Sequence, residues 1–346
     1  MCNLCRGLPA FKCDDEYLCV FRDVEVGKRG GDVTRPSEAG GRNPLSAAYI
    51  KLLSSLLQSS YLAQFRLCLS DTHFVAVYDF QPHQYQYQSK QTTNTMAAKK
   101  VLIVMSDAHS FPLYNTGSDG KTVSQESGYF LMELAKPLQK VLDAGYEVTF
   151  ASPEGKEPQP DPLSVSLAAY AGNFYKRNQD QELIERMKRE NGFSSPRKFS
   201  DISDEELKSY AGVFIPGGHA PLADLGDNPE LGRILSHFHE QQKPTAALCH
   251  GPWAFLSTKA GPRKEFAYKG YKLTAWSDAE EKFMETMLRG EITKVESTLR
   301  ENGADMQEGV AKSMGSITVD REVITGDNPM SANAIGDKFL EMMAAK

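Results

Sequence analysis

The chain has 346 residues and a formal net charge of −6, and 40% of its residues are hydrophobic, enough to bury a globular core. A mildly acidic chain without a basic stripe is a poor candidate for binding nucleic acid or an anionic membrane surface. No apolar stretch is long enough to cross a bilayer, and the N-terminus lacks the basic start and apolar core of a secretory signal. We therefore expect a cytoplasmic protein, with the nucleus as an alternative location.

The cysteines are unevenly distributed along the chain. Cys2, Cys5, Cys13, Cys19 and Cys68 lie in the first fifth, and Cys249 stands alone in the remainder. This distribution does not suggest a disulfide framework and is typical of a reducing compartment. The Cys2–Cys5 pair could bind zinc together with Cys13 and Cys19, but the irregular spacing favours chance clustering.

The first part of the chain differs in character from the rest. Residues 1–95 include a Gly/Arg-rich stretch and end in a polar tract, Gln81 to Thr95, that reads as a linker. We predict an N-terminal extension over residues 1–95 that is poorly ordered or atypical, followed by one domain over residues 96–346. An alternative is that the extension lies upstream of a natural start at Met96.

After Lys99 the sequence becomes strongly periodic. Apolar runs predict strands at 101–105, 146–151, 213–215, 245–248, 272–275, 316–319 and 323–325. Helical spacing of apolar residues predicts helices at 124–144, 229–242 and 331–345. The polar residues 153–197, helical in the middle, predict an insertion or lid.

Strands that alternate with helices predict an α/β fold with a mostly parallel sheet. Right-handed crossovers then give a doubly wound, flavodoxin-like arrangement with helices on both faces. Ligands of such sheets bind at the carboxyl ends of the strands. We therefore expect the functional residues directly after strands.

Cys249 is placed as a nucleophile would be. The buried run 245–248 ends at this cysteine, and Gly251 and Pro252 then suit a first helical turn. The arrangement resembles a strained nucleophile elbow with Cys in place of Ser. A helix N-terminus would also lower the pKa of the thiol. The competing interpretation is an inert core cysteine.

Spacing alone leaves several candidate partners for Cys249. His250 could activate the thiol as a base, or it could face solvent. Asp278, Glu280 and Glu281 follow a predicted strand, so any of them could orient the histidine or be an ordinary first-turn acid.

Two further segments predict contacts with the thiol. Gly217, Gly218 and His219 follow another strand, where paired glycines let backbone N–H groups approach an oxyanion, or form a plain turn. Glu133 lies off the apolar stripe of its helix, where a surface acid is common. However, Pro137 cannot donate to the carbonyl of residue 133, and helical side chains lean toward the N-terminus, so Glu133 could reach Cys249.

Residues 96–346 resemble the ThiJ/PfpI superfamily, in the branch of chaperone-like, glutathione-independent glyoxalases (glyoxalase III). The resemblance rests on Glu133 within residues 128–134, Pro216-Gly217-Gly218-His219, Cys249-His250-Gly251-Pro252, residues 276–281 and residues 325–333, in this order. It implies a class I glutamine amidotransferase-like fold and a homodimer. One departure is Ala220, which stands where the superfamily usually has glycine after the histidine.

The resemblance also implies a chemistry. It makes Cys249 the nucleophile, His250 its partner, Glu281 the third member of a triad and Glu133 the acid beside the thiol. The implied reaction converts methylglyoxal, or glyoxal in the same way, to a hydroxy acid (D-lactate from methylglyoxal) without glutathione or another cofactor, as in a D-lactate dehydratase of the stress response. Some relatives bind a metal through histidines in the insertion, but residues 153–197 contain none, so we expect no metal site.

Rival functions use the same residues differently. The thiol could remove early glycation adducts from proteins and nucleotides, or cleave amides or peptides. A holdase chaperone would instead bind unfolded proteins through an exposed apolar surface. A redox sensor would have its thiol oxidised beside Glu133.

Overall fold

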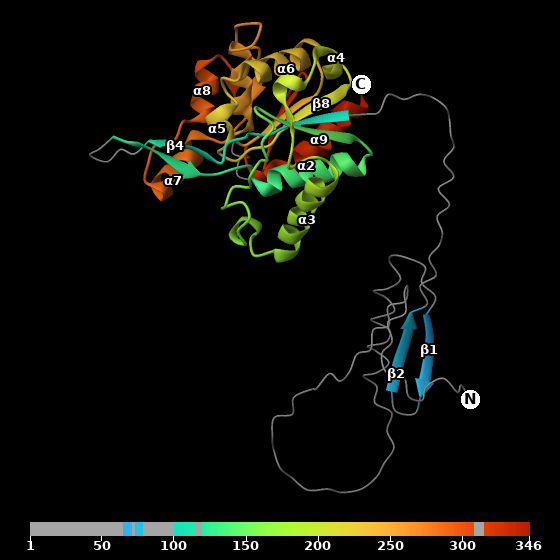
Figure 1. Ribbon diagram of the computed structural model, residues 1–346. Helices are drawn as coiled ribbons and strands as arrows, with labels where there is room; N and C mark the ends of the chain where they lie inside the picture. Colours follow the sequence, from blue (N-terminus) through green and yellow to red (C-terminus); the bar gives the residue numbers. More distant parts are fainter. Residues whose placement is uncertain (1–64, 71–72, 79–99, 115–119, 308–314) are drawn as a thin grey trace. The chain divides into compact units, whose positions relative to one another are not determined.

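The computed structural model describes residues 65–70, 73–78, 100–114, 120–307 and 315–346 (Figure 1). Internal contacts divide the chain into two units, Met1–Thr92 and Thr93–Lys346. In the first unit, β1 (Phe65–Ser70) and β2 (His73–Tyr78) form an antiparallel pair. The predicted linker, the alternative zinc cluster and most of the predicted extension lie outside the described residues.

The second unit is built on a seven-stranded sheet in the order β12-β13-β9-β8-β3-β6-β7. Its strands are β3 (Lys100–Val104), β6 (Glu147–Ser152), β7 (Arg197–Lys198), β8 (Tyr210–Ile215), β9 (Thr245–Leu248), β12 (Ile317–Asp320) and β13 (Val323–Gly326). Only the β12–β13 pairing within this sheet is antiparallel, and the other neighbours run parallel. The prediction of a mostly parallel, doubly wound sheet is confirmed.

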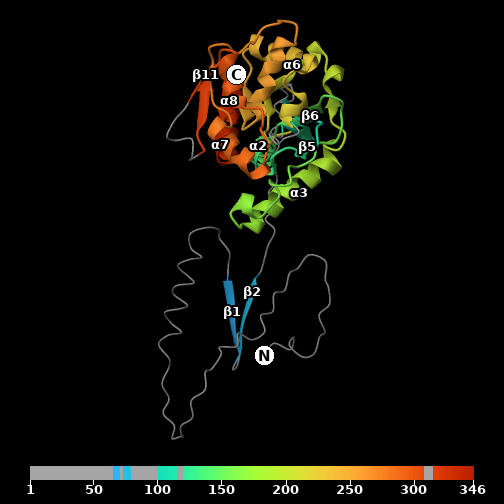
Figure 2. The ribbon, with the colours of Figure 1, turned by 90° about the vertical axis from the view of Figure 1, so that its left-hand side faces the viewer.

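Helices cover both faces of this sheet because its strands are apolar on both sides (Figures 1 and 2). Along β3, Leu102 and Val104 pack into one core, whereas Val101 and Ile103 pack into the other. Successive side chains of a strand point to opposite faces, so a wholly apolar run requires cover on each face.

The helices divide between the two cores. On one face lie α2 (Leu131–Asp143), α3 (Phe174–Glu190) and α9 (Ala332–Ala344). On the other lie α4 (Asp204–Leu207), α6 (Pro229–Glu240), the 3₁₀ helix η3 (Gly251–Lys259) and α8 (Val295–Glu301). The remaining short helices are η1 (Ala168–Tyr170), η2 (Phe199–Asp201), α5 (Pro221–Asp224) and η5 (Pro329–Ser331), and α7 (Asp278–Leu288) precedes α8. No described helix is long and apolar enough to span a membrane.

The helix predicted at 124–144 is shorter in the structure, where α2 begins at Leu131, seven residues after the predicted start. Ser124 instead lies in β5 (Thr122–Glu126), which forms a hairpin with β4 (Ser110–Tyr114). The residues between β5 and α2 are held extended: Tyr129 N–H donates to Gln159 O and Phe130 N–H to Gly217 O. These long-range bonds replace the local bonds of a helix, which the sequence pattern could not reveal.

The predicted strand at 272–275 is also placed differently. Its strand part, β10 (Lys272–Leu273), pairs with β11 (Asp305–Met306) in a separate two-stranded sheet. The segment still reaches the carboxyl edge of the main sheet, because Trp276 N–H donates to Cys249 O at 3.0 Å. The residues that follow it are thereby held beside Cys249.

Candidate active site

Cys249 follows β9 directly in a left-handed backbone conformation, with φ +59°. That conformation is costly for a residue with a side chain and persists only where the surroundings enforce it. Two contacts do so here: Cys249 N–H donates to Gly326 O, and Cys249 O accepts from Trp276 N–H. The helix that we expected after Cys249 is present and is the 3₁₀ helix η3. The thiol is therefore fixed at the carboxyl ends of β9 and β13, at 4% residue exposure.

His250 lies between the thiol and a carboxylate. Its Nδ1 is 3.2 Å from Cys249 Sγ, and its Nε2 is 2.7 Å from Glu281 Oε2. A carboxylate only accepts, so Nε2 donates to Glu281 and Nδ1 is left to accept the thiol proton. Burial, and then the nearby His219, lower the pKa of His250, which favours the neutral, basic ring.

Glu281 is the acid that the structure brings to His250. Burial opposes its ionisation, but the attraction to His250 and the hydrogen bonds from His219 and His250 outweigh burial and lower the pKa of Glu281 to about 2. Asp278, by contrast, accepts from the backbone N–H and the hydroxyl of Ser297 at the start of α8.

Glu280 also has a structural position. It forms a capping box with Ser277, whose hydroxyl accepts from Glu280 N–H while the Glu280 carboxylate accepts from Ser277 N–H. The S-x-x-E pattern was readable in the sequence and would have assigned Glu280 to the cap. Asp278 could be excluded as the acid that orients His250 only from the position of α8.

His219 joins the same carboxylate from the other side. Its Nε2 lies 3.1 Å from Glu281 Oε1, and its ring stacks on Phe111 of β4 with centroids 4.7 Å apart. The sequence predicted substrate or oxyanion contact for His219, and the structure shows a hydrogen bond to Glu281. The ligand atoms of His219, His250 and Glu281 lie within 4.8 Å of one another, close enough to hold a metal ion. Both ring nitrogens, however, are already at hydrogen-bond distance from the carboxylate.

Glu133 of α2 approaches Cys249 from the core that α2 shares with this cysteine. Its Oε2 accepts from Gly217 N–H at 3.0 Å, and its Oε1 has no nitrogen or oxygen partner among the described residues. Glu133 is fully buried, and burial raises its pKa to about 8 despite the hydrogen bonds from Cys249 and Gly217. The carboxyl is therefore protonated at neutral pH.

The thiol does not have the lowered pKa that its position at a helix start suggested. Burial raises the pKa of Cys249 well above its ordinary value, and the charge of an ionised Glu133 raises it further. The backbone N–H groups of Gly218 and His250 point at Sγ and act in the opposite direction. The protonation states of the thiol and of the Glu133 carboxyl therefore depend on each other. A protonated Glu133 has no negative charge, so it does not repel a thiolate at Cys249.

The two glycines after β8 have separate positions. Gly217 packs so closely that an added Cβ would overlap Glu133 Oε2, and its N–H binds that carboxyl instead of an oxyanion. Gly218 has φ +93°, and an added Cβ would overlap Gly128 O. Its N–H remains directed at the sulfur together with that of His250. An oxyanion formed on a carbon bonded to Sγ would meet these two donors.

A buried cysteine, histidine and carboxylate at the carboxyl ends of parallel strands define a candidate cysteine-nucleophile enzyme. Residues 124–286 match the model of the ThiJ/PfpI family-like group. The protein/nucleic acid deglycase HchA of Escherichia coli O1:K1 / APEC is 28% identical over 251 residues, which are 71% of this chain and 81% of the relative. HchA of the E24377A strain is likewise 28% identical, over 252 residues.

Solved structures share the fold of the second unit. Glyoxalase III of Candida albicans matches with a TM-score of 0.57 and 24% identity, over 71% of this chain and 98% of that one. Rapid Encystment Protein of Francisella tularensis matches with a TM-score of 0.54 and 21% identity, over 71% and 99%. The family match and the relatives show that the chain is similar to the ThiJ/PfpI superfamily.

Proposed function

We propose that the protein is a glutathione-independent glyoxalase that converts methylglyoxal to D-lactate. The observation that carries the proposal is the enclosure of the Cys249 thiol between a protonated carboxyl, Glu133, and a neutral histidine, His250. Isomerising a hydroxy ketone needs a nucleophile to hold it and groups that both give and take protons. The site supplies both within one buried cluster.

The first step joins the thiol to the aldehyde. His250 Nδ1 takes the proton from Cys249, and the sulfur adds to C1 of methylglyoxal. The aldehyde oxygen gains the negative charge, receives hydrogen bonds from the N–H groups of Gly218 and His250, and becomes a hydroxyl when a proton is returned. The product is a hemithioacetal, with the ketone at C2 intact.

The second step moves hydrogen within the bound molecule. His250 takes the C1 proton while Glu133 gives its proton to the C2 oxygen, which yields an enediol. His250 then gives a proton to C2 while the C1 hydroxyl returns a proton to the Glu133 carboxylate, which yields the thioester of lactate. C1 is oxidised and C2 is reduced by the same amount, so the step requires no redox cofactor. Glu133 is suited to this transfer because its Oε1 is free of nitrogen and oxygen partners among the described residues. Water then cleaves the thioester, releasing D-lactate and restoring the thiol.

Burial at the site favours a small substrate. Cys249 is 4% exposed, and the side chains of His250 and Glu281 are each 1% exposed. A three-carbon aldehyde needs less access than an extended polypeptide, so these values favour methylglyoxal or glyoxal over a peptide.

A protein or nucleotide deglycase is the second candidate. Its support is the similarity to the HchA proteins, which are named as protein/nucleic acid deglycases. The thiol chemistry would be shared, because an early glycation adduct is also a masked aldehyde carbon. A larger substrate would have to bring that carbon to the buried sulfur.

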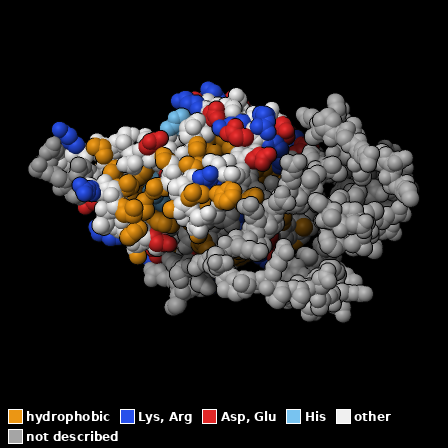
Figure 3. All heavy atoms as spheres, turned by 90° about the horizontal axis from the view of Figure 1, so that it is seen from below, with side chains coloured by type: hydrophobic (Ala, Val, Ile, Leu, Met, Phe, Trp, Pro, Cys, Tyr) orange, Lys and Arg blue, Asp and Glu red, His pale blue; other side chains and the backbone are white. Residues whose placement is uncertain are grey.

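A holdase chaperone is the candidate from another class. Figure 3 shows hydrophobic side chains gathered on the face seen from below, and large hydrophobic side chains such as Tyr175, Phe283 and Met330 are exposed. Such surface suits binding of unfolded chains. This activity would not depend on Cys249, so suppression of aggregation by Cys249→Ala separates it from the enzymatic proposals.

The deciding experiment measures D-lactate formed from methylglyoxal without glutathione, using wild type and Cys249→Ala. We expect the variant to lose activity and the control Cys68→Ala, which removes a thiol from the other unit, to retain it. Full activity of Cys249→Ala would refute the glyoxalase. Release of lactate from glycated protein but none from free methylglyoxal would favour the deglycase.

A further inference from the structure

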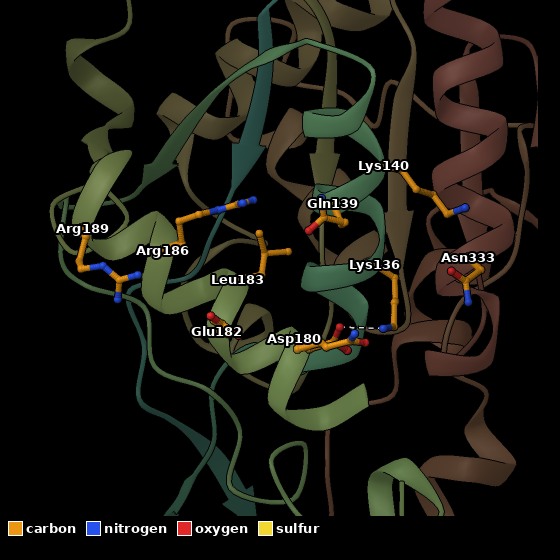
Figure 4. A pocket seen from close by; sticks show the side chains of 10 residues that line it. Lys136, Gln139, Lys140, Asp180, Glu182, Leu183, Arg186, Arg189 and Asn333 are labelled. Atoms are coloured by element: carbon orange, nitrogen blue, oxygen red, sulfur yellow. Dashed lines mark hydrogen bonds and ion pairs between the residues drawn. The ribbon is translucent and has the colours of Figure 1, made fainter. Parts of the chain in front are cut away.

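A cavity of about 470 Å³ lies between α2, α3 and α9, away from the residues around Cys249 (Figure 4). It is lined by α2 residues beyond Glu133, by one face of α3 and by Asn333 at the start of α9. Its volume falls within the range of about 300–1,000 Å³ that is typical of small-molecule sites. Size alone therefore allows an organic ligand rather than a bare ion.

The charged lining of this cavity is predominantly basic. Its charged residues are Lys136, Lys140, Arg186 and Arg189 against Asp180 and Glu182. Four cations against two carboxylates leave a formal charge of +2 in a protein whose total is −6. A local excess of positive charge on an acidic protein favours an anionic ligand.

Both oxygens of the Asp180 carboxylate already accept a hydrogen bond. One oxygen accepts from Lys136 Nζ at 2.7 Å (Figure 4), and the other accepts from the Tyr170 hydroxyl at 2.8 Å. Lys140 is likewise paired, with Asp337 at 2.5 Å. These pairs hold the two lysines at one side of the cavity and engage both oxygens of Asp180.

Two arginines of α3, Arg186 and Arg189, have N–H donors available to a ligand. Arg186 points from α3 toward α2, and its Nε is buried without a hydrogen-bond partner among the described residues (Figure 4). The ion pairs among the described residues include neither Arg186 nor Arg189, which lie one helical turn apart. An unpartnered buried guanidinium donor is costly, and an oxyanion is the group that satisfies its fork of N–H donors.

We propose that this cavity binds a small organic anion through a phosphate or carboxylate group held by Arg186, with Arg189 at the rim. The amide side chains of Gln139 and Asn333 also line the cavity and supply further donors and acceptors for the uncharged part of such a ligand. The proposal is independent of the reaction at Cys249.

The test is a calorimetric titration of the full chain with ribose 5-phosphate, citrate and inorganic phosphate in separate arms. We expect one of the two organic anions to bind at a single site in the millimolar range or tighter, and inorganic phosphate to bind more weakly. The tighter organic anion shows whether the cavity selects phosphate or carboxylate. Arg186→Gln should weaken binding by about tenfold or more, because it removes a charge-assisted hydrogen bond.

Arg177→Gln is the matched control, because Arg177 lies on α3 and bonds to its neighbour Asn178 instead of lining the cavity. It should leave binding unchanged. If Arg186→Gln does not fold, Arg186→Lys keeps the charge and loses the fork, and it should bind more weakly than wild type. Absence of saturable binding in all three arms, or equal affinity of wild type and the Arg186 variant, would overturn the proposal.

Discussion

His250 Nε2 lies 2.7 Å from Glu281 Oε2, and both side chains are almost completely buried. This hydrogen bond fixes the ring so that Nδ1 faces the sulfur of Cys249. The same carboxylate accepts from His219, so one acid holds two imidazoles. The orientation of the base therefore depends on Glu281 more than on its own neighbours in sequence.

Glu281→Gln should lower kcat/KM for methylglyoxal by about 10²- to 10⁴-fold, because an amide can present its N–H and leave His250 in the wrong tautomer. The matched control is Asp278→Asn in the same helical turn. Its carboxylate bonds to Ser297, so we expect lower stability with little change in activity. Steady-state kinetics and thermal unfolding of both variants check this, and the reverse pattern would assign Asp278 to the triad.

Glu133→Gln should reduce the pH dependence of stability. The pKa of Glu133 rises from 4.5 in the unfolded chain to about 8 in the folded protein. Between those values the folded protein holds a proton that the unfolded chain has released, so this group's contribution to stability falls as pH rises. The effect is at most about 1.4 kcal/mol per pH unit.

We therefore expect the free energy of unfolding, measured with urea, to decline less with pH across this window in Glu133→Gln than in wild type. Glu126→Gln, at an exposed position of β5, is the control. Parallel pH profiles for wild type and Glu133→Gln would contradict the buried, protonated state of this carboxyl.

Gly218→Ala should destabilise the fold by about 2–5 kcal/mol, since it combines a positive φ with overlap against backbone. The added Cβ would overlap Gly128 O, which belongs to the extended segment before α2. Gly172→Ala is the control, because Gly172 has φ +80° but nothing lies within 4 Å of an added Cβ. It should cost about 1 kcal/mol, and equal losses for both variants would show that the contact with Gly128 is unimportant.

Expressing the chain from Met96 should leave the glyoxalase reaction unchanged. All of the candidate site residues lie in the unit Thr93–Lys346, which contains its own two cores. D-lactate formation and the thermal midpoint, compared with the full chain, check this. Loss of activity with unchanged stability would assign a role in the reaction to residues 1–95.

Local sequence was sufficient for most strands of the main sheet and for the position of Cys249. A strand covered on both faces must be apolar at every position. Runs such as 101–104 and 245–248 could therefore be predicted as strands without knowing which strands they pair with. Gly251 and Pro252, shortly after Cys249, likewise indicated a sharp turn. These are properties of a few neighbouring residues, and the sequence specifies them directly.

Tertiary structure decided what surrounds the sulfur. The sequence pattern assigns Glu280 to the helix cap but does not separate Asp278 from Glu281, and only the packing of α7 and α8 turns Glu281 toward His250. The pKa of Cys249 was misjudged because a helix start predicts a lowered value, whereas burial and Glu133 raise it. Burial and charge act through space, from α2 and from the end of β8. The local sequence therefore determines where Cys249 lies, whereas residues distant in the chain determine the pKa and reactivity of its thiol.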